Sequence, residues 1–249
     1  MFYRRQGRGE PVLLLHGFAS SSLFWAELAD RLGSRFDVIA PDWPGFGQSQ
    51  GLAPYTNLDE FAAGVIQLAD RLGLGDFHVV GHSMSGFVVQ ALLHQWPDRI
   101  KKAVLYGAGL SVNKARRFES IAQTLDRLRT DGPQLTSVRV IQSWFADIER
   151  DRHAYQHCLK AACGMTLAAA SAAVQAMEQV DFSCQPPPAA KSVLVLAGEA
   201  ERSHPPASAL ELSAALPGAH LGIVPFCGHA AHLEQPELFY LMVKRFLGS

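Results

Sequence analysis

Gly81-His82-Ser83-Met84-Ser85-Gly86 directly follows the apolar run 77–80 and decides the fold of this chain. A short buried strand that reaches Gly81, turns at Ser83 and continues as a helix is the setting of a nucleophile elbow, where a strained turn lifts a serine hydroxyl above the sheet. Strand and helix nearly touch there, so the residues two before and two after the serine must be small. Gly81 meets this requirement, and Ser85 stands where glycine is usual. The alternative interpretation is an ordinary strand-to-helix turn with a capping serine.

Short apolar runs recur along the chain and predict the strands of one sheet. Because they are apolar throughout rather than alternating, we expect strands buried on both faces, as in a parallel sheet. The runs are 12–15, 37–40, 77–80, 102–106, 192–197 and 220–224. Amphipathic helical segments at 24–32, 58–72 and 87–95 separate the earlier runs. This alternation predicts an α/β fold with a doubly wound, mostly parallel sheet.

The alternation stops between residues 111 and 188, where no strand pattern occurs. Helical spacing begins with Phe118, Ile121, Ala122, Leu125 and Leu128, and further helices are expected over 135–146, 154–163 and 166–180. We therefore expect an α/β core formed by residues 1–110 and 189–249, with residues 111–188 as an inserted helical cap.

Composition and charge limit the classes of function. The 249 residues are 48% hydrophobic with a formal net charge of −1, which suits a globular domain and offers no basic surface for nucleic acid. The sequence has no apolar run long enough for a membrane span and no signal-peptide pattern at its start. The spacing of the four cysteines fits neither a zinc site nor a disulfide framework, so we expect reduced thiols and a cytoplasmic protein. The oligomeric state is not indicated.

Acyl transfer needs a nucleophile, a base, a group that orients the base, and donors for the oxyanion. Ser83 is the candidate nucleophile. His229 is favoured over His232 as the base because it follows Gly228 in the loop after the last expected strand. The loop after 192–197 offers two carboxylates, Glu201 and Glu199, and we favour Glu201. The chain order serine, acid, histidine is then the order used at a nucleophile elbow of this kind.

The oxyanion hole needs two backbone N–H groups aimed at one point. Met84, directly after the nucleophile, would supply one. Phe18 would supply the other from the loop His16-Gly17-Phe18, and its ring would form a wall of the acyl pocket. The side chain of His16 is interpreted as structural.

Four segments together resemble the α/β-hydrolase superfamily, in particular its small esterase-type members with a helical cap. They are the loop 16–18, the turn Asp42-Trp43-Pro44-Gly45-Phe46-Gly47-Gln48-Ser49, the elbow 81–86, and Gly228-His229 followed by Glu234-Gln235-Pro236. The resemblance covers essentially the whole chain. It implies an acid three residues after Gly198, which is Glu201 where aspartate is usual, and a cap over Ser83. Plausible residues of the cap that would line the substrate pocket are Trp144, Phe145, Phe118 and Met177.

The sequence thus predicts a serine hydrolase of carboxylic esters with a Ser83, His229 and Glu201 triad, needing neither a metal nor an organic cofactor. Its partner would be a small-molecule ester. A thioesterase or a lactone or enol-lactone hydrolase would use the same machinery. A small-molecule receptor with a retained triad is the alternative from a different class, and turnover separates it from an enzyme.

Overall fold

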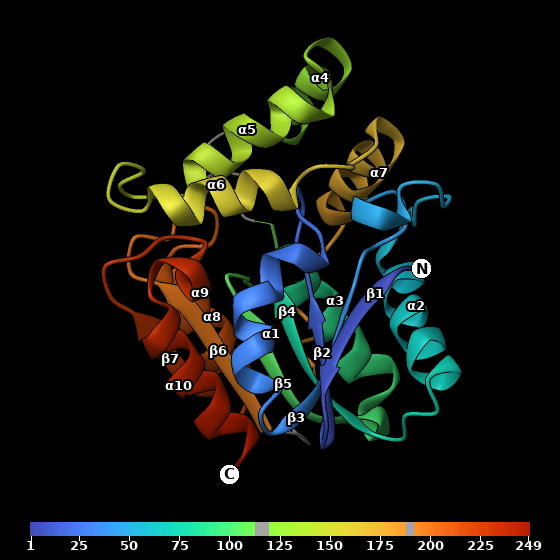
Figure 1. Cartoon of the computed structure of the whole chain (residues 1–249), viewed down its shortest axis with the longest axis vertical. Coiled ribbons are helices and arrows are strands. Elements are labelled where there is room, and N and C mark those ends of the chain that lie inside the picture. Colours follow the sequence, from blue (N-terminus) through green and yellow to red (C-terminus); the bar gives the residue numbers. More distant parts are fainter. Residues whose placement is uncertain (113–119, 188–191) are drawn as a thin grey trace.

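A single mixed sheet organises the chain, whose computed structural model describes residues 1–112, 120–187 and 192–249 (Figure 1). In the described residues the strand order is β1-β3-β2-β4-β5-β6-β7. β1 pairs antiparallel with β3, and every other neighbouring pair is parallel. The strands are β1 Tyr3–Gly7, β2 Glu10–Leu15, β3 Phe36–Pro41, β4 Phe77–His82, β5 Ile100–Tyr106, β6 Ser192–Gly198 and β7 His220–Val224.

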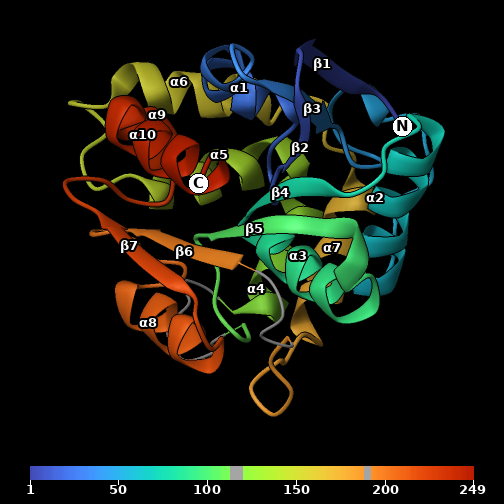
Figure 2. The same ribbon diagram turned by 90° about the horizontal axis from the view of Figure 1, so that it is seen from below.

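Helices cover both faces of this sheet. Figure 2 shows α1 and α10 on one face and α2, α3 and α8 on the other. The fold class predicted from the apolar runs, a doubly wound, mostly parallel sheet, is confirmed. The bounds are α1 Ala26–Leu32, α2 Leu58–Arg71, α3 Met84–Gln95, α8 Pro206–Ala215, α9 Ala231–Glu234 and α10 Pro236–Leu247. No helix within the described ranges is long and apolar enough to cross a membrane.

The two edges of the sheet differ from the expectation. β1 was not predicted, because its sequence Tyr3-Arg4-Arg5-Gln6-Gly7 is polar and mostly exposed and carries no apolar run. β7 was expected to be buried on both faces, which is wrong: Leu221 and Ile223 remain 40% and 38% exposed. An edge strand has a neighbour on one side only, and helices cover it less completely.

In the described residues between β5 and β6, the chain forms four helices, which lie above the sheet in Figure 1. They are α4 Ile121–Thr130, α5 Gly132–Trp144, α6 Arg152–Ala161 and α7 Leu167–Glu178, which correspond to the four helices expected from the spacing. Phe118 lies outside the described residues, as does the expected boundary between 188 and 189. The division into a core and a cap stays a prediction.

The junction of β4 and α3 lies at the centre of the sheet and is tightly packed. A Cβ atom added to Gly81 would lie 2.3 Å from the carbonyl oxygen of Ser85, an approach that only glycine permits. All residues from Met84 to Leu93 on α3 are buried. The strand and the helix are therefore in contact through their backbones, as the elbow requires.

Gly81→Ala should lower the free energy of unfolding by about 2 kcal/mol, because the methyl group overpacks a contact between two backbone segments. Gly75→Ala is the matched control, since a Cβ there meets nothing within 4 Å, and it should leave stability unchanged or slightly raised. Urea denaturation of both variants measures the difference. Equal stability of the two variants would contradict the packing argument.

Candidate active site

Ser83 occupies a strained turn at the end of β4. Its backbone angles are φ 54° and ψ −117°, a left-handed conformation that is rare for a residue with a side chain. Two backbone hydrogen bonds hold it there: its N–H donates to the Tyr106 carbonyl over 2.8 Å, and its carbonyl accepts from the Gly86 N–H over 2.8 Å. Ser83 stays partly exposed while its neighbours His82 and Met84 are buried.

Glu201 and His229 form a buried pair at the same end of the sheet. The Nδ1 atom of His229 is hydrogen-bonded to Oε2 of Glu201. The other oxygen, Oε1, accepts the N–H groups of Ser203 at 2.6 Å and His204 at 3.2 Å. Because a carboxylate only accepts, His229 carries its proton on Nδ1, which leaves Nε2 free to receive a proton.

The charge of Glu201 is maintained despite its burial. Burial raises the pKa of this carboxyl, but the charge and the hydrogen bond of His229 oppose it and leave the pKa below its ordinary value. A deprotonated Glu201 is the form that stabilises a protonated imidazole on His229.

The backbone of His229 is anchored from two sides. Its N–H donates to the carbonyl of Trp144, the last residue of α5, over 2.9 Å. Its carbonyl accepts the Tyr106 hydroxyl at 2.7 Å and Nε2 of His82 at 3.0 Å. The ring of His229 is thus positioned by both the sheet and the helical layer above it.

The alternative acid and base are engaged elsewhere. Glu199 accepts a hydrogen bond from the Phe226 N–H over 3.0 Å. His232 is buried, and its Nε2 donates to the Phe24 carbonyl over 3.0 Å. Burial lowers the pKa of His232 to about 3. Of the two carboxylates and two histidines weighed in the sequence, the structure brings Glu201 and His229 together.

The loop that carries Phe18 lies directly against the elbow. A Cβ atom added to Gly17 would lie 3.0 Å from Cβ of Ser83, so glycine permits this approach. Within the described part of the chain, neither the Phe18 N–H nor the Met84 N–H is hydrogen-bonded to another protein group. Both remain available as donors beside Ser83.

Ser85, which replaces the usual glycine, fastens this loop to the elbow. Its hydroxyl donates to the carbonyl of His16 over 2.5 Å, and the indole N–H of Trp43 donates to the same carbonyl over 2.9 Å. The Trp43 backbone N–H donates to Nε2 of His16 over 3.1 Å. Burial lowers the pKa of His16 to about 4, so its neutral ring serves as a structural element, as the sequence indicated.

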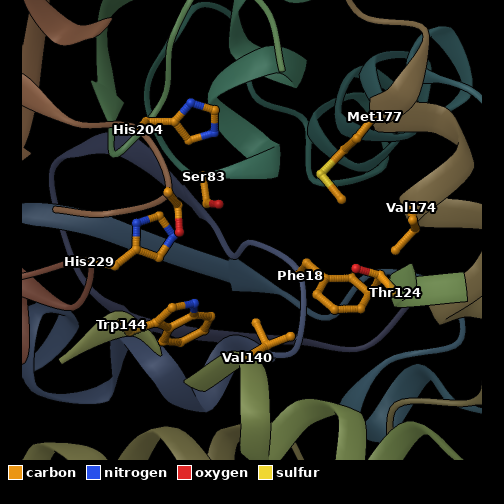
Figure 3. Close-up of a pocket in the computed structure, with 10 residues that line it drawn as sticks. Phe18, Ser83, Thr124, Val140, Trp144, Val174, Met177, His204 and His229 are labelled. Atoms are coloured by element: carbon orange, nitrogen blue, oxygen red, sulfur yellow. The ribbon is translucent and has the colours of Figure 1, made fainter. Parts of the chain in front are cut away.

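The pocket beside Ser83 is enclosed by loops at the end of the sheet and by residues of the helices α4, α5 and α7. Figure 3 shows Ser83, His204, His229 and Trp144 on one side and Phe18, Val174 and Met177 on the other. Its volume is about 50 Å³. The lining residues are Phe18, Ser83, Thr124, Val140, Trp144, Val174, Met177, Ser203, His204 and His229.

Two of the four expected cap residues, Trp144 and Met177, line this pocket. Phe145 is not among the described lining residues: it is buried, and its ring packs edge-on against Tyr155 at 5.7 Å. Phe118 lies outside the described residues.

Five lining residues were missed in the sequence. Val140 and Val174 could have been found from helical spacing, because they lie four residues before Trp144 on α5 and three before Met177 on α7. Thr124, Ser203 and His204 carried no comparable signal. No group of three or more His, Cys, Asp or Glu side chains suited to a metal ion occurs among the described residues.

Known proteins resemble this chain along most of its length. A family model described as alpha/beta hydrolase fold matches residues 10–236. The (E)-2-((N-methylformamido)methylene)succinate hydrolase of Acinetobacter baylyi is 31% identical over 60% of this chain and 56% of its own length. The dihydrolipoyllysine-residue acetyltransferase component of the acetoin cleaving system of Cupriavidus necator is 32% identical over 99% of this chain and 66% of its own. The chain thus spans less than two thirds of the length of these two relatives.

Among solved structures, the enol-lactonase from Burkholderia xenovorans LB400 superposes with a TM-score of 0.90 at 22% identity. The match covers 100% of this chain and 96% of that one. At this identity the likeness shows a shared fold.

Glu201→Gln should slow the reaction of Ser83 with a fluorophosphonate by at least about 100-fold, because the amide cannot stabilise a protonated His229 and favours the wrong tautomer. Glu199→Gln is the matched control and should react within a few-fold of the natural sequence. Labelling rates followed by intact-protein mass spectrometry compare the two. A reversed order would assign the acid to Glu199.

His229→Ala should abolish this labelling, because Ser83 loses the group that accepts its proton. His232→Ala should keep the labelling but lower the free energy of unfolding by about 1–3 kcal/mol, since the buried Phe24 carbonyl loses its donor. Labelling and thermal unfolding are measured on the same preparations. An unreactive His232→Ala that remains folded, beside a reactive His229→Ala, would overturn the assignment of the base.

Proposed function

Because the chain belongs to the alpha/beta hydrolase fold family, we propose that it is a serine hydrolase that cleaves carboxylic esters through an acyl-enzyme. Ser83 is the nucleophile, His229 the general base and Glu201 the acid that orients it. The observation that carries this proposal is the buried hydrogen bond between Glu201 and His229, whose imidazole lines the same pocket as the strained Ser83.

The first half-reaction forms the acyl-enzyme. The Ser83 hydroxyl attacks the ester carbonyl while Nε2 of His229 takes its proton. Glu201 stabilises the resulting imidazolium. The tetrahedral intermediate then collapses, and His229 returns the proton to the departing alcohol.

The second half-reaction repeats these steps with water as the nucleophile. His229 takes a proton from water, the hydroxide adds to the acyl carbonyl, and Ser83 leaves with the proton of the imidazolium.

The N–H groups of Phe18 and Met84 would hold the oxyanion in both halves. Ser85 and Trp43 fix the Phe18 loop by donating hydrogen bonds to the His16 carbonyl. The two N–H donors therefore need little rearrangement as negative charge develops on the oxyanion.

The pocket favours a small, uncharged acyl group. A volume of about 50 Å³ accommodates only a few water molecules. Its described walls include Phe18, Val140 and Val174, which offer apolar contacts to an acyl chain. Acetyl and propionyl esters fit this description better than long-chain esters.

Activated esters of increasing acyl length test the proposal. We expect many turnovers on p-nitrophenyl acetate and propionate, with kcat/KM falling by at least about tenfold toward octanoate because a long chain cannot enter the pocket. Ser83→Ala should lose nearly all turnover. Initial rates on thioesters and lactones are measured under the same conditions for comparison.

A higher kcat/KM on a lactone or thioester than on the p-nitrophenyl esters would assign the protein to that substrate class and would leave the triad unchanged. A single slow turnover on every substrate would contradict an enzyme and favour a receptor. An active Ser83→Ala would overturn the mechanism.

A further inference from the structure

One buried carboxylate holds the peptide groups on both sides of His229. Glu234, the last residue of α9, accepts the Gly228 N–H at 3.0 Å on each of its two oxygens. Its Oε1 also accepts the Ala230 N–H at 3.1 Å. Ala230 precedes α9 and has no side chain that could cap the helix, so Glu234 reaches back and serves in its place.

The opposite side of this loop is held by the last residue of α5 and by the segment that follows this helix. The His229 N–H donates to the Trp144 carbonyl, and the guanidinium of Arg150 donates to the Phe226 carbonyl over 2.8 Å. Three consecutive N–H groups, those of Gly228, His229 and Ala230, thus have partners, and Glu234 supplies two of them. Without this carboxylate, His229 would be flanked by two buried N–H groups lacking acceptors.

The surroundings of Glu234 make its charge costly. The pKa of Glu234 is raised to about 7. Burial is the largest cause and nearby Asp151 acts in the same direction, while the two N–H groups and Arg150 act in the opposite direction. Arg150 is itself paired with Asp151 over 2.5 Å.

Two thiols and one hydroxyl near Glu234 do not change charge near neutrality. Cys227 lies in the same loop, and burial raises its pKa to about 12. Burial also raises the pKa of Cys158 on α6 and of Tyr106 on β5 well above their ordinary values. Among these four groups, the carboxyl of Glu234 is the one whose pKa lies close to physiological pH.

We propose that Glu234 is a positioning residue whose ionised carboxylate holds His229 in place, and that protonation of this carboxylate releases the histidine loop and lowers activity. The activity part of this proposal rests on the proposed function. A carboxylate accepts charge-assisted hydrogen bonds, which are about twice as strong as neutral ones. The protonated acid loses one acceptor oxygen and its charge, so the bonds to Gly228 and Ala230 weaken together.

The Gly228 amide reports on Glu234 without any substrate. In His229→Asn, which removes the titration of the imidazole itself, the amide resonance of Gly228 should shift with an apparent pKa near 7 in a titration from about pH 5 to pH 9. Glu234→Gln in the same background should abolish the shift. Glu199→Gln should leave it unchanged, because Glu199 binds the Phe226 N–H of the same loop but is exposed.

A Gly228 amide that does not titrate in His229→Asn would overturn the proposal, even if Glu234→Gln fails to fold. The result does not depend on ester hydrolysis, so it separates a failure of this inference from a failure of the proposed function.

Ester hydrolysis supplies the second readout. At pH 8 we expect Glu234→Gln to have roughly tenfold lower kcat/KM than the natural sequence, with the loss mainly in kcat, because a displaced general base slows proton transfer. At pH 6 the two proteins should converge, since both then carry a neutral side chain at 234. Glu199→Gln should follow the natural sequence throughout. Parallel pH profiles for Glu234→Gln and the natural sequence would overturn the role in activity.

Discussion

The backbone conformation of Ser83 is the constraint on which the rest of the site depends. A left-handed φ on a residue with a side chain costs about 1–3 kcal/mol, and the turn persists because its surroundings leave it no alternative. Gly81 allows α3 to lie against β4 immediately after the turn. The strain is thus balanced by the packing of β4 against α3, which are buried over nearly their whole length.

Tyr106 links this strained turn to the histidine. Its carbonyl accepts the Ser83 N–H, and its hydroxyl donates to the His229 carbonyl. Burial raises the pKa of the Tyr106 hydroxyl well above its ordinary value, so it remains a donor. One fully buried residue on β5 therefore fixes the backbones of both Ser83 and His229, although they are 146 positions apart in the chain.

The sequence predicted those features that depend on continuous burial or on a local turn. Apolar runs predicted six of the strands, whereas β1, with its polar sequence, pairs at an edge where no burial signal arises. Glu201 and Glu199 lie two residues apart, and sequence alone could not tell which one reaches His229, because that depends on the path of a short loop. Phe145 was expected beside Trp144 in the pocket, but it follows α5 with an extended backbone, and its ring packs against Tyr155.

Two buried carboxylates bind the His229 segment, and their pKa values move in opposite directions because their partners differ in charge. Glu201 faces an imidazole that can carry a positive charge, which outweighs the cost of burial. Glu234 faces neutral N–H groups, and burial prevails. The pKa of Glu234 is higher in the folded chain than in the unfolded chain. The free energy of unfolding therefore decreases as the pH rises from 4.5 to about 7 and Glu234 becomes charged. The negative charge on Glu234, which holds the histidine loop in place, therefore lowers the stability of the fold. Glu201 keeps its charge below pH 4.5, because its pKa is lowered.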